Sequence, residues 1–77
     1  MRKLLRLTIP PNLVNEPIIY KMITQYNLIP NILEARLDGD ALGEVVIRLE
    51  GTPLDLERGI LYLKELQIEV ETLESQS

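Results

Sequence analysis

The chain has 77 residues, of which 45% are hydrophobic and 26% are charged, a balance typical of one folded domain rather than a disordered chain. It contains no cysteine and no histidine, which excludes disulfides, thiolate or imidazole metal sites, cysteine nucleophiles and histidine bases. The net charge of −4 would repel a phosphate backbone. We therefore expect no nucleic acid partner, no metal and no cofactor.

No stretch of the sequence approaches the roughly 20 apolar residues of a membrane-spanning helix. Near the N-terminus, Arg6 interrupts the apolar run that a secretory signal would need. We expect a cytoplasmic protein that does not insert into a membrane and that reaches one only through a partner.

The first third of the chain predicts a strand followed by a helix. Residues 3–9 alternate between two faces, as in a half-buried strand. Pro10 and Pro11 end this strand, because proline has no amide hydrogen to donate to a sheet. A helix follows, capped by Asn15 and closed by Asn27, with its apolar side chains on one face.

Two strands joined by a hairpin are predicted next. Pro30 favours an extended conformation for the residue before it, so the second strand begins at about Asn31 and runs to Leu37. Residues 38–43 are rich in turn formers, and residues 44–50 alternate again as a third strand.

The start of the second helix is the best-marked boundary in the sequence. Thr52 can cap it and Pro53 suits its first position, whereas Gly59 inside the helix predicts a close approach to a neighbouring element. Residues 67–73 alternate as a fourth strand, and residues 74–77 are polar and predicted to form a disordered tail.

This order of elements, βαββαβ, predicts an α+β ferredoxin-like fold. Right-handed crossovers would place the first and third strands at the centre of a four-stranded antiparallel sheet, with both helices on one face. We expect one domain over residues 1–77, with its folded core at about 2–73.

The sheet face opposite the helices carries apolar side chains that the helices cannot cover. Strict alternation places Leu4, Ile32 and Val46 on this outer face, together with Arg6 and Arg48. Three apolar residues on neighbouring strands of so small a domain suggest a partner, such as a second copy. We predict these five residues to form the interface of a homodimer.

Charged side chains offer further sites, each with a simpler alternative. Asp38 with Asp40, or Glu69 with Glu71, could form a carboxylate pair for acid–base chemistry, but aspartates also serve turns and edge-strand charges also prevent aggregation. We expect no catalytic residue and no enzyme, and we retain a small hydrolase or isomerase using Asp38, Asp40 or Glu71 only as a third class of function. A group of charged residues on the outer face has two interpretations, an anion site or a solvated face of complementary charges: Arg6, Glu34, Arg36 and Arg48.

The tripeptide Asn31-Ile32-Leu33 resembles the signature of the NIL domain, a ferredoxin-like module at the C-terminus of bacterial methionine-importer ATPases. The resemblance extends over nearly the whole chain. Similar features follow in the family's order: Glu16-Pro17-Ile18-Ile19, Gly43, Leu49-Glu50-Gly51, Ile60-Leu61-Tyr62-Leu63 and Ile68-Glu69-Val70-Glu71.

The resemblance implies a regulatory role in which two NIL domains pair, bind methionine near their interface and hold the ATPase inactive. Asn31 matches the motif asparagine, which implies that it binds the ligand, with Ile32 in apolar contact beside it. Each residue also has a structural explanation. Asn31 could be a turn residue whose side chain hydrogen-bonds to the nearby backbone, and Ile32 could pack as an ordinary residue of an edge strand. Pro10 and Pro11 depart from the family's small turn, which implies an altered pocket.

The chain has no phosphate-binding GxxxxGK[ST] loop and is short for an ATPase, so we expect a free-standing module that regulates a partner in trans. Our leading hypothesis is a non-catalytic homodimer that senses methionine or a related amino acid and modulates a transporter or metabolic protein. The alternative is an interaction or dimerisation module without a small-molecule ligand.

Overall fold

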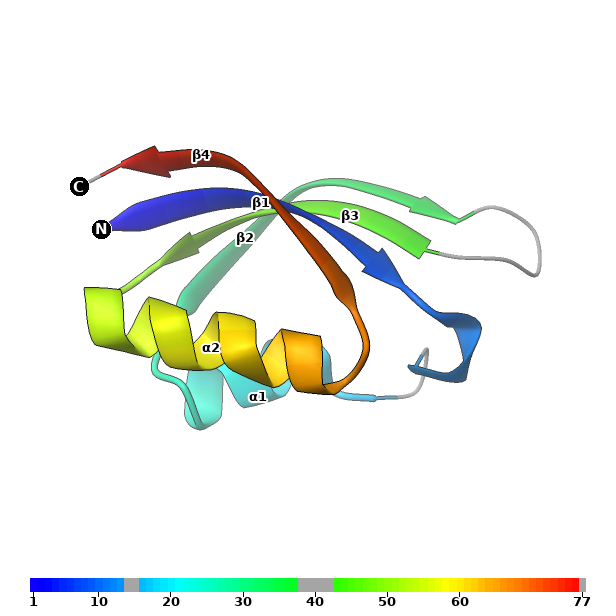
Figure 1. The fold of residues 1–77 in the computed structure, drawn as a ribbon, viewed down its shortest axis with the longest axis horizontal. Helices are drawn as coiled ribbons and strands as arrows, with labels where there is room; N and C mark the ends of the chain where they lie inside the picture. The colour runs from blue at the N-terminus through cyan, green and yellow to red at the C-terminus, as the bar shows by residue number, and fades with distance from the viewer. Residues whose placement is uncertain (14–15, 38–42, 77) are drawn as a thin grey trace.

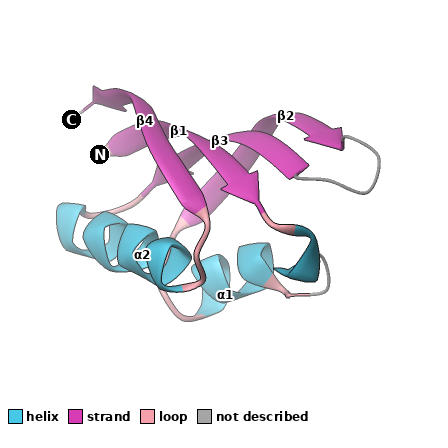
Figure 2. Ribbon diagram, turned by 45° about the vertical axis from the view of Figure 1, so that its right-hand side comes forward, coloured by secondary structure: helices cyan, strands magenta, loops and turns pink. Residues whose placement is uncertain are grey.

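A computed structural model describes residues 1–13, 16–37 and 43–76. Figure 1 shows a twisted sheet with two helices beneath it, and Figure 2 confirms that both helices lie on the same face. The elements in chain order are β1 (Arg2–Ile9), a 3-10 helix η1 (Pro11–Leu13), α1 (Ile18–Thr24), β2 (Ile29–Leu37), β3 (Gly43–Glu50), α2 (Pro53–Glu65) and β4 (Glu69–Gln76).

The sheet has the strand order β2-β3-β1-β4, and each neighbouring pair is antiparallel. The predicted ferredoxin-like α+β fold, with the first and third strands at the centre, is therefore confirmed. The two ends of the chain lie side by side, because Arg2 pairs with Gln76 (Figure 1).

The core lies between the central strands and the helices, because these strands have apolar side chains at every second position on the face that the helices cover. All of the fully or nearly fully buried hydrophobic side chains among the described residues come from this layer: Leu5, Leu7, Ile18, Met22, Leu28, Ile47, Leu49, Leu56, Leu63 and Ile68.

The α1 helix is shorter than predicted. It begins at Ile18, and the position before the helix is Pro17, which has no side-chain hydrogen bond to cap it. The predicted cap, Asn15, lies outside the described residues. The helix ends at Thr24, earlier than the predicted end at Asn27, and Asn27, with a positive φ of 57°, lies in the turn between the helix and β2.

Both predicted features of α2 are present. The Oγ1 of Thr52 accepts a hydrogen bond of 3.1 Å from the amide of Asp55, which caps the helix, and Pro53 occupies its first turn. Gly59 is buried where α2 approaches Leu28, and a Cβ at this position would lie 2.5 Å from Leu28 Cδ1.

Two β-bulges interrupt the edge strands, and neither was predicted. In β2, Ile32 pairs with Ile47 and Glu34 pairs with Val46, so Leu33 is an extra residue. In β4, Leu73 is the corresponding extra residue, between the partners of Leu4 and Leu5. Because Leu5 pairs with Ile47, the two bulges lie on either side of this one row of the sheet. Bulges increase the local twist, in keeping with the strongly twisted sheet in Figure 1.

The bulge in β2 changes which face Ile32 occupies. Residues directly opposite each other on antiparallel strands point to the same face. Ile47 is fully buried under the helices, so Ile32 lies on the helix-covered side and not on the outer face. The predicted placement is wrong because the extra residue breaks the alternation after Ile32.

The predicted disordered tail is also corrected. Residues 74–76 continue β4, where Glu74 pairs with Leu4, Ser75 with Lys3 and Gln76 with Arg2. The polar composition of these residues does not predict a strand. The strand forms because the neighbouring β1 starts at Arg2 and offers backbone groups for residues 74–76 to pair with. Ser77 lies outside the described residues.

Candidate functional site

A cavity of about 320 Å³ lies at one end of the interface between the sheet and α1. Its walls come from the end of β1, the segment that includes η1, the first turns of α1, and strands β2 and β3. The lining is almost entirely apolar and consists of Leu7, Ile9, Pro10, Pro11, Leu13, Glu16, Ile18, Ile19, Ile32, Ala35, Arg36, Gly43 and Val45. We refer to this space as the β2–α1 cavity.

The chain after β1 forms one wall of the cavity because it turns sharply. Pro10 and Pro11 end the strand, and the carbonyl of Pro10 accepts a hydrogen bond of 3.0 Å from the amide of Leu13. The carbonyl of Leu13 in turn accepts one of 3.0 Å from Glu16. Both prolines therefore line the cavity, together with Leu13 of the 3-10 turn.

Two charged residues of opposite sign line this apolar space, Glu16 before α1 and Arg36 on β2. The carboxylate of Glu16 accepts a hydrogen bond of 2.8 Å from Lys21 Nζ. This hydrogen bond raises the pKa of Lys21, with a smaller opposing effect from burial. Arg36 lies 3.5 Å from Glu34, and both of these side chains are largely exposed.

A pair of tyrosines packs beside the Glu16–Lys21 pair. The rings of Tyr26 and Tyr62 stack with their centroids 5.0 Å apart. The hydroxyl of Tyr62 is buried and has no hydrogen-bond partner within the part of the chain that the structure describes. Burial raises the pKa of Tyr62, while the positive charge of Lys21 opposes the shift.

The structure separates the two residues that the sequence predicted as ligand contacts. Ile32 lines the β2–α1 cavity. Asn31 is exposed and pairs with Arg48, on the opposite face of the sheet. A single protomer therefore does not bring these two side chains to one site, and their predicted ligand-binding roles stay predictions.

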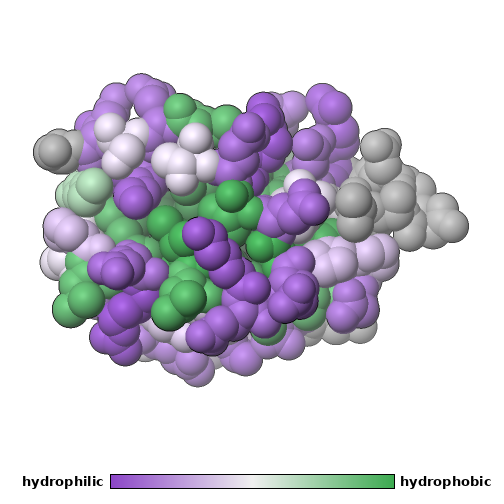
Figure 3. Space-filling view, viewed as in Figure 1, coloured by the Kyte–Doolittle hydropathy of each residue, from purple (hydrophilic) through white to green (hydrophobic). Residues whose placement is uncertain are grey.

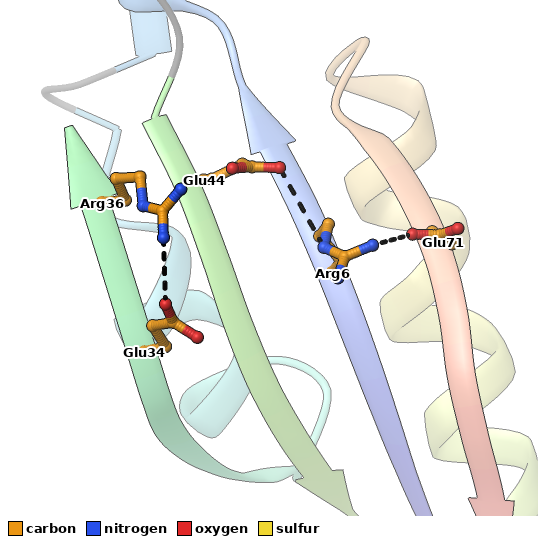
Figure 4. Close-up of polar contacts among 5 residues, drawn as sticks. All are labelled: Arg6, Glu34, Arg36, Glu44 and Glu71. Atoms are coloured by element: carbon orange, nitrogen blue, oxygen red, sulfur yellow. Dashed lines mark hydrogen bonds and ion pairs between the residues drawn. The ribbon is translucent and has the colours of Figure 1, made fainter. Parts of the chain in front are cut away.

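The outer face of the sheet is mainly charged (Figure 4). The guanidinium of Arg6 lies between two glutamates, 2.5 Å from Glu71 and 4.0 Å from Glu44. Leu4 and Val46 lie on this face and are only partly exposed. Arg6 already has acidic partners, so the arrangement favours a solvated face of complementary charges over an anion site.

The interface prediction for Leu4, Arg6, Val46 and Arg48 is not tested by one protomer. Their positions on the outer face agree with it, because Leu4 pairs with Arg48 and Arg6 pairs with Val46 across β1 and β3. Ile32, the fifth predicted member, lies on the other side of the sheet.

The carboxylate pairs do not form an acid–base site among the described residues. Glu69 and Glu71 share the outer face through their pairing with Thr8 and Arg6, and Glu71 has Arg6 as its partner. Asp38 and Asp40 lie outside the described residues. Within the described ranges, no three acidic side chains gather closely enough to hold a metal ion.

A second groove lies between the start of β1 and α2. Met1, Ile60 and Leu61 contribute apolar surface to it, and Lys3 and Lys64 lie among its walls. Figure 3 shows hydrophobic atoms along the seam between the sheet and α2 on this side of the molecule. This groove mixes apolar with charged side chains, because Glu57 also lies in its wall. Nowhere in the described residues is a helix long and apolar enough to cross a membrane.

Sequence reasoning missed most of the cavity. Glu16 was seen only as part of the family feature Glu16-Pro17-Ile18-Ile19, and Arg36 only as a residue of the outer face. Pro10 and Pro11 were seen as the end of a strand and as a departure from the family's turn that implies an altered pocket. The two prolines after β1 were a signal for the cavity wall that they form. The opposite wall, on β2, could not be assigned from the sequence, because it depends on the bulge at Leu33.

Three comparisons place the chain among known proteins. A family model described as the NIL domain matches residues 3–72. The chain is 36% identical over 73 residues to the methionine import ATP-binding protein MetN of Coxiella burnetii. It is 34% identical over 73 residues to MetN 1 of Paraburkholderia xenovorans. Both alignments cover 91% of this chain but only 21% of the relative, so the chain spans about a fifth of their length.

Solved structures share the fold. The C-terminal domain of an ABC transporter ATP-binding protein from Enterococcus faecalis aligns with a TM-score of 0.80 at 22% identity, over 96% of this chain and 86% of that one. The de novo designed protein Foldit4 aligns with a TM-score of 0.60 at 18% identity, over 97% of each chain. Together with the match over residues 3–72, these findings establish that the chain belongs to the NIL domain family.

Proposed function

We propose that the chain is a regulatory domain that binds a small amino acid such as methionine in the β2–α1 cavity and modulates a transporter or metabolic partner. The observation that carries this proposal is an apolar cavity whose lining residues include one acidic and one basic residue, Glu16 and Arg36. The guanidinium of Arg36 itself contacts Glu34 on the outer side of β2. An amino acid carries an ammonium, a carboxylate and a side chain. The carboxylate of Glu16 complements the first and the apolar wall the third, and the guanidinium of Arg36 would complement the second if it turned away from Glu34.

The size and chemistry of the cavity support an apolar side chain as the specific part of the ligand. Its volume of about 320 Å³ falls at the lower end of the range of roughly 300–1,000 Å³ that small-molecule pockets occupy. Methionine is unbranched and polarisable, so it adapts to an irregular apolar wall such as the one formed by Pro10, Pro11 and Ile19.

The partner is proposed from the relatives. Their names describe methionine import ATP-binding proteins, and this chain matches only 21% of their length. A domain of this kind would report ligand occupancy to an ATPase or another protein, either in the same chain or in trans. We further propose that two copies pair when they act, with Asn31 contributing to the ligand site from the surface of the sheet.

The decisive experiment measures the thermal midpoint of unfolding with each of the twenty amino acids at millimolar concentration. A ligand at 100 times its dissociation constant adds about 2.7 kcal/mol to the free energy of unfolding, which shifts the midpoint of a domain of this size by several degrees. We expect methionine or a close analogue to raise the midpoint. Methioninamide, which lacks the carboxylate, should raise it less.

Matched variants locate the site. Arg36→Gln and Glu16→Gln should each weaken methionine binding at least tenfold while the fold is retained, because each removes the charge proposed to pair with one end of the amino acid. Arg58→Gln on exposed α2 serves as the control. Asn31→Ala tests the motif asparagine separately. Unchanged affinity in both cavity variants would exclude this cavity as the site.

The alternative function is an interaction module without a small-molecule ligand. The exposed apolar side chains of edge strand β2 favour it, since Ile29 is 64% exposed and Leu33 is 48% exposed. If no amino acid raises the thermal midpoint, this second function becomes the better account of the molecule.

A further inference from the structure

The second groove, which we call the β1–α2 groove, has one wall at the start of β1 and one on α2. Met1 and Lys3 form the first wall. The second wall is one flank of α2, whose lining residues recur at helical spacing over three turns from Pro53 to Lys64. At 1.5 Å per residue this flank is about 16 Å long. The groove has a volume of about 420 Å³ and is long enough to hold a secondary-structure element.

The apolar residues of this groove are incompletely covered by the rest of the chain. Leu61 is 55% exposed and Met1 is 39% exposed, whereas Ile60 is partly buried. Hydrophobic atoms follow this seam in Figure 3. A small molecule in the groove would leave the outer side of these residues in water, whereas a larger partner would cover it. An apolar surface with a polar rim is typical of a protein interaction site.

The groove offers no backbone hydrogen bonds to a partner. β1 is a central strand and pairs with β3 on one side and with β4 on the other. The backbone groups within α2 are bonded along the helix. An extended peptide placed between them would bury amides and carbonyls without partners, which is costly. A helix satisfies its own backbone groups, so the occupant that fits is a helix that inserts apolar side chains.

The charges of the groove favour an acidic helix. Lys3 lies on one wall and Lys64 on the other, and neither forms an ion pair with a described residue. These two lysines and Glu57 are the charged residues among the described lining, so the walls carry +1, whereas the whole chain carries −4. Complementary charge at the rim of an interface steers and orients the partner. Carboxylates beside the apolar stripe of a helix would supply both lysines with partners.

We propose that the β1–α2 groove binds an amphipathic helix of another protein, with its apolar stripe against Met1, Ile60 and Leu61 and acidic side chains against Lys3 and Lys64. This inference deepens the proposed function, because it names the surface and the class of partner through which a regulatory domain would act. It rests on that function only for its biological role. The binding itself requires no amino acid.

Two other occupants fit these observations less well. In a second copy, α1 carries no acidic residue, and the buried face of α2 already packs on its own sheet. A second copy therefore does not supply the helix that the charges favour. An anionic lipid surface would attract Lys3 and Lys64, but the net charge of −4 opposes its approach.

Titration with designed helical peptides, followed by NMR spectroscopy of the isotope-labelled chain, tests the proposal. The probe is a synthetic peptide of about four helical turns, covalently held as a helix, with leucines at i, i+3, i+4 and i+7 and glutamates on both flanks. The matched control peptide has lysine in place of each glutamate. We expect the acidic peptide to bind at least tenfold more tightly. It should shift the amide signals of residues 1–3 and 57–64 but not those of β2.

Charge reversals in the protein locate the contact. Lys3→Glu and Lys64→Glu should each weaken binding of the acidic peptide at least fivefold and strengthen binding of the basic peptide. Leu61→Ser should weaken binding of both peptides, because it removes apolar contact. The control is Arg58→Glu, an equal charge change at an exposed position of α2 that does not line the groove, and it should leave both affinities nearly unchanged. The thermal midpoint of each variant without peptide verifies that the fold is retained.

Four results would overturn the proposal. Equal affinity for the two peptides would remove the charge preference, and shifts confined to another surface would place the peptide elsewhere. No binding of the acidic peptide at millimolar concentration would exclude a helix as the occupant. Binding to phosphatidylserine vesicles that Lys3→Glu and Lys64→Glu abolish, without peptide binding, would assign the groove to lipid. Shifts at the groove that depend on protein concentration alone would assign it to a second copy.

The titrations are made without amino acid, so this proposal and the proposed function fail separately. Peptide binding by a chain that no amino acid stabilises would leave the groove assigned and overturn the sensor function. A chain that methionine stabilises but that binds neither peptide would keep the sensor function and overturn the helix-binding groove.

Discussion

At the scale of single residues, Gly59 shows how tightly α2 is packed. The side chain of Leu28 fills the space between two glycines, because a Cβ at Gly59 would lie 2.5 Å from Leu28 Cδ1 and one at Gly51 would lie 2.8 Å from Cδ2. Leu28 is only 2% exposed and cannot move away from one glycine without approaching the other. The prediction of a close approach at Gly59, made from a glycine inside a helix, is confirmed.

Gly59→Ala should therefore destabilise the domain even though alanine is the better helix former. The gain in helix propensity is about 1 kcal/mol, whereas overpacking a close contact costs about 1–3 kcal/mol. We expect a net loss in the free energy of unfolding, measured by urea denaturation. Arg58→Ala, at an exposed neighbouring position, should change it by less than about 0.5 kcal/mol. A more stable Gly59→Ala variant would contradict this packing.

For Tyr62 we predict the opposite effect, a gain in stability on substitution, because its hydroxyl is buried without a hydrogen-bond partner among the described residues. Leaving a polar group unpaired costs about 1–3 kcal/mol, so Tyr62→Phe should keep the ring stack with Tyr26 and raise the free energy of unfolding by about 1 kcal/mol at neutral pH. Tyr20→Phe, at an exposed site, is the control. A loss of stability in Tyr62→Phe would show that the hydroxyl has a partner.

The pH dependence of Tyr62→Phe provides a second readout. Burial raises the pKa of Tyr62 in the folded state above its ordinary value of 10.0. Above pH 10 the unfolded chain loses this proton before the folded chain does, so the wild type loses stability as the pH rises. The stability advantage of Tyr62→Phe should therefore grow between pH 10 and 11, beyond the change common to both proteins.

At the scale of elements, the strands were easier to predict than their ends and their bulges. The positions of β1 and β3 followed from alternation, since each is regular and buried on one face. The bulges at Leu33 and Leu73 were missed because each extra residue is an ordinary leucine that fits the apolar pattern on either face. The misplacement of Ile32 followed directly from the first bulge.

The end of β4 was missed because its residues are polar and show no apolar alternation. Such residues still form a strand when a neighbouring strand offers unpaired backbone groups. Deleting residues 74–77 should therefore destabilise the domain by about 1–3 kcal/mol, because the pairing of residues 74–76 with β1 is lost and a backbone hydrogen bond contributes about 0.5–1.5 kcal/mol. Urea denaturation measures the loss. Ser75→Ala keeps the backbone and should be nearly neutral, and an equally stable truncated chain would show that this segment contributes nothing.

At the scale of the whole molecule, the fold was predictable and the cavity was not. The order of strands depends on local patterns plus the right-handed crossover rule, and both can be read from one sequence. The β2–α1 cavity instead depends on how closely three distant segments approach each other, around Pro11, Ile19 and Arg36. Such distances are set by side-chain packing and by the bulge, which periodicity does not report.

The row of glutamates on β4 affects whether the sheet can grow by the addition of further copies of the chain. A sheet that adds copies at both edges becomes a fibre, and this requires two adhesive edges on every protomer. Here Glu69, Glu71 and Glu74 make one edge repel its own kind. A second copy that approached this edge with its own β4 would bring these carboxylates together, so addition of copies through β4 is disfavoured. Charge on one strand thereby opposes the growth of this sheet into a fibre at that edge.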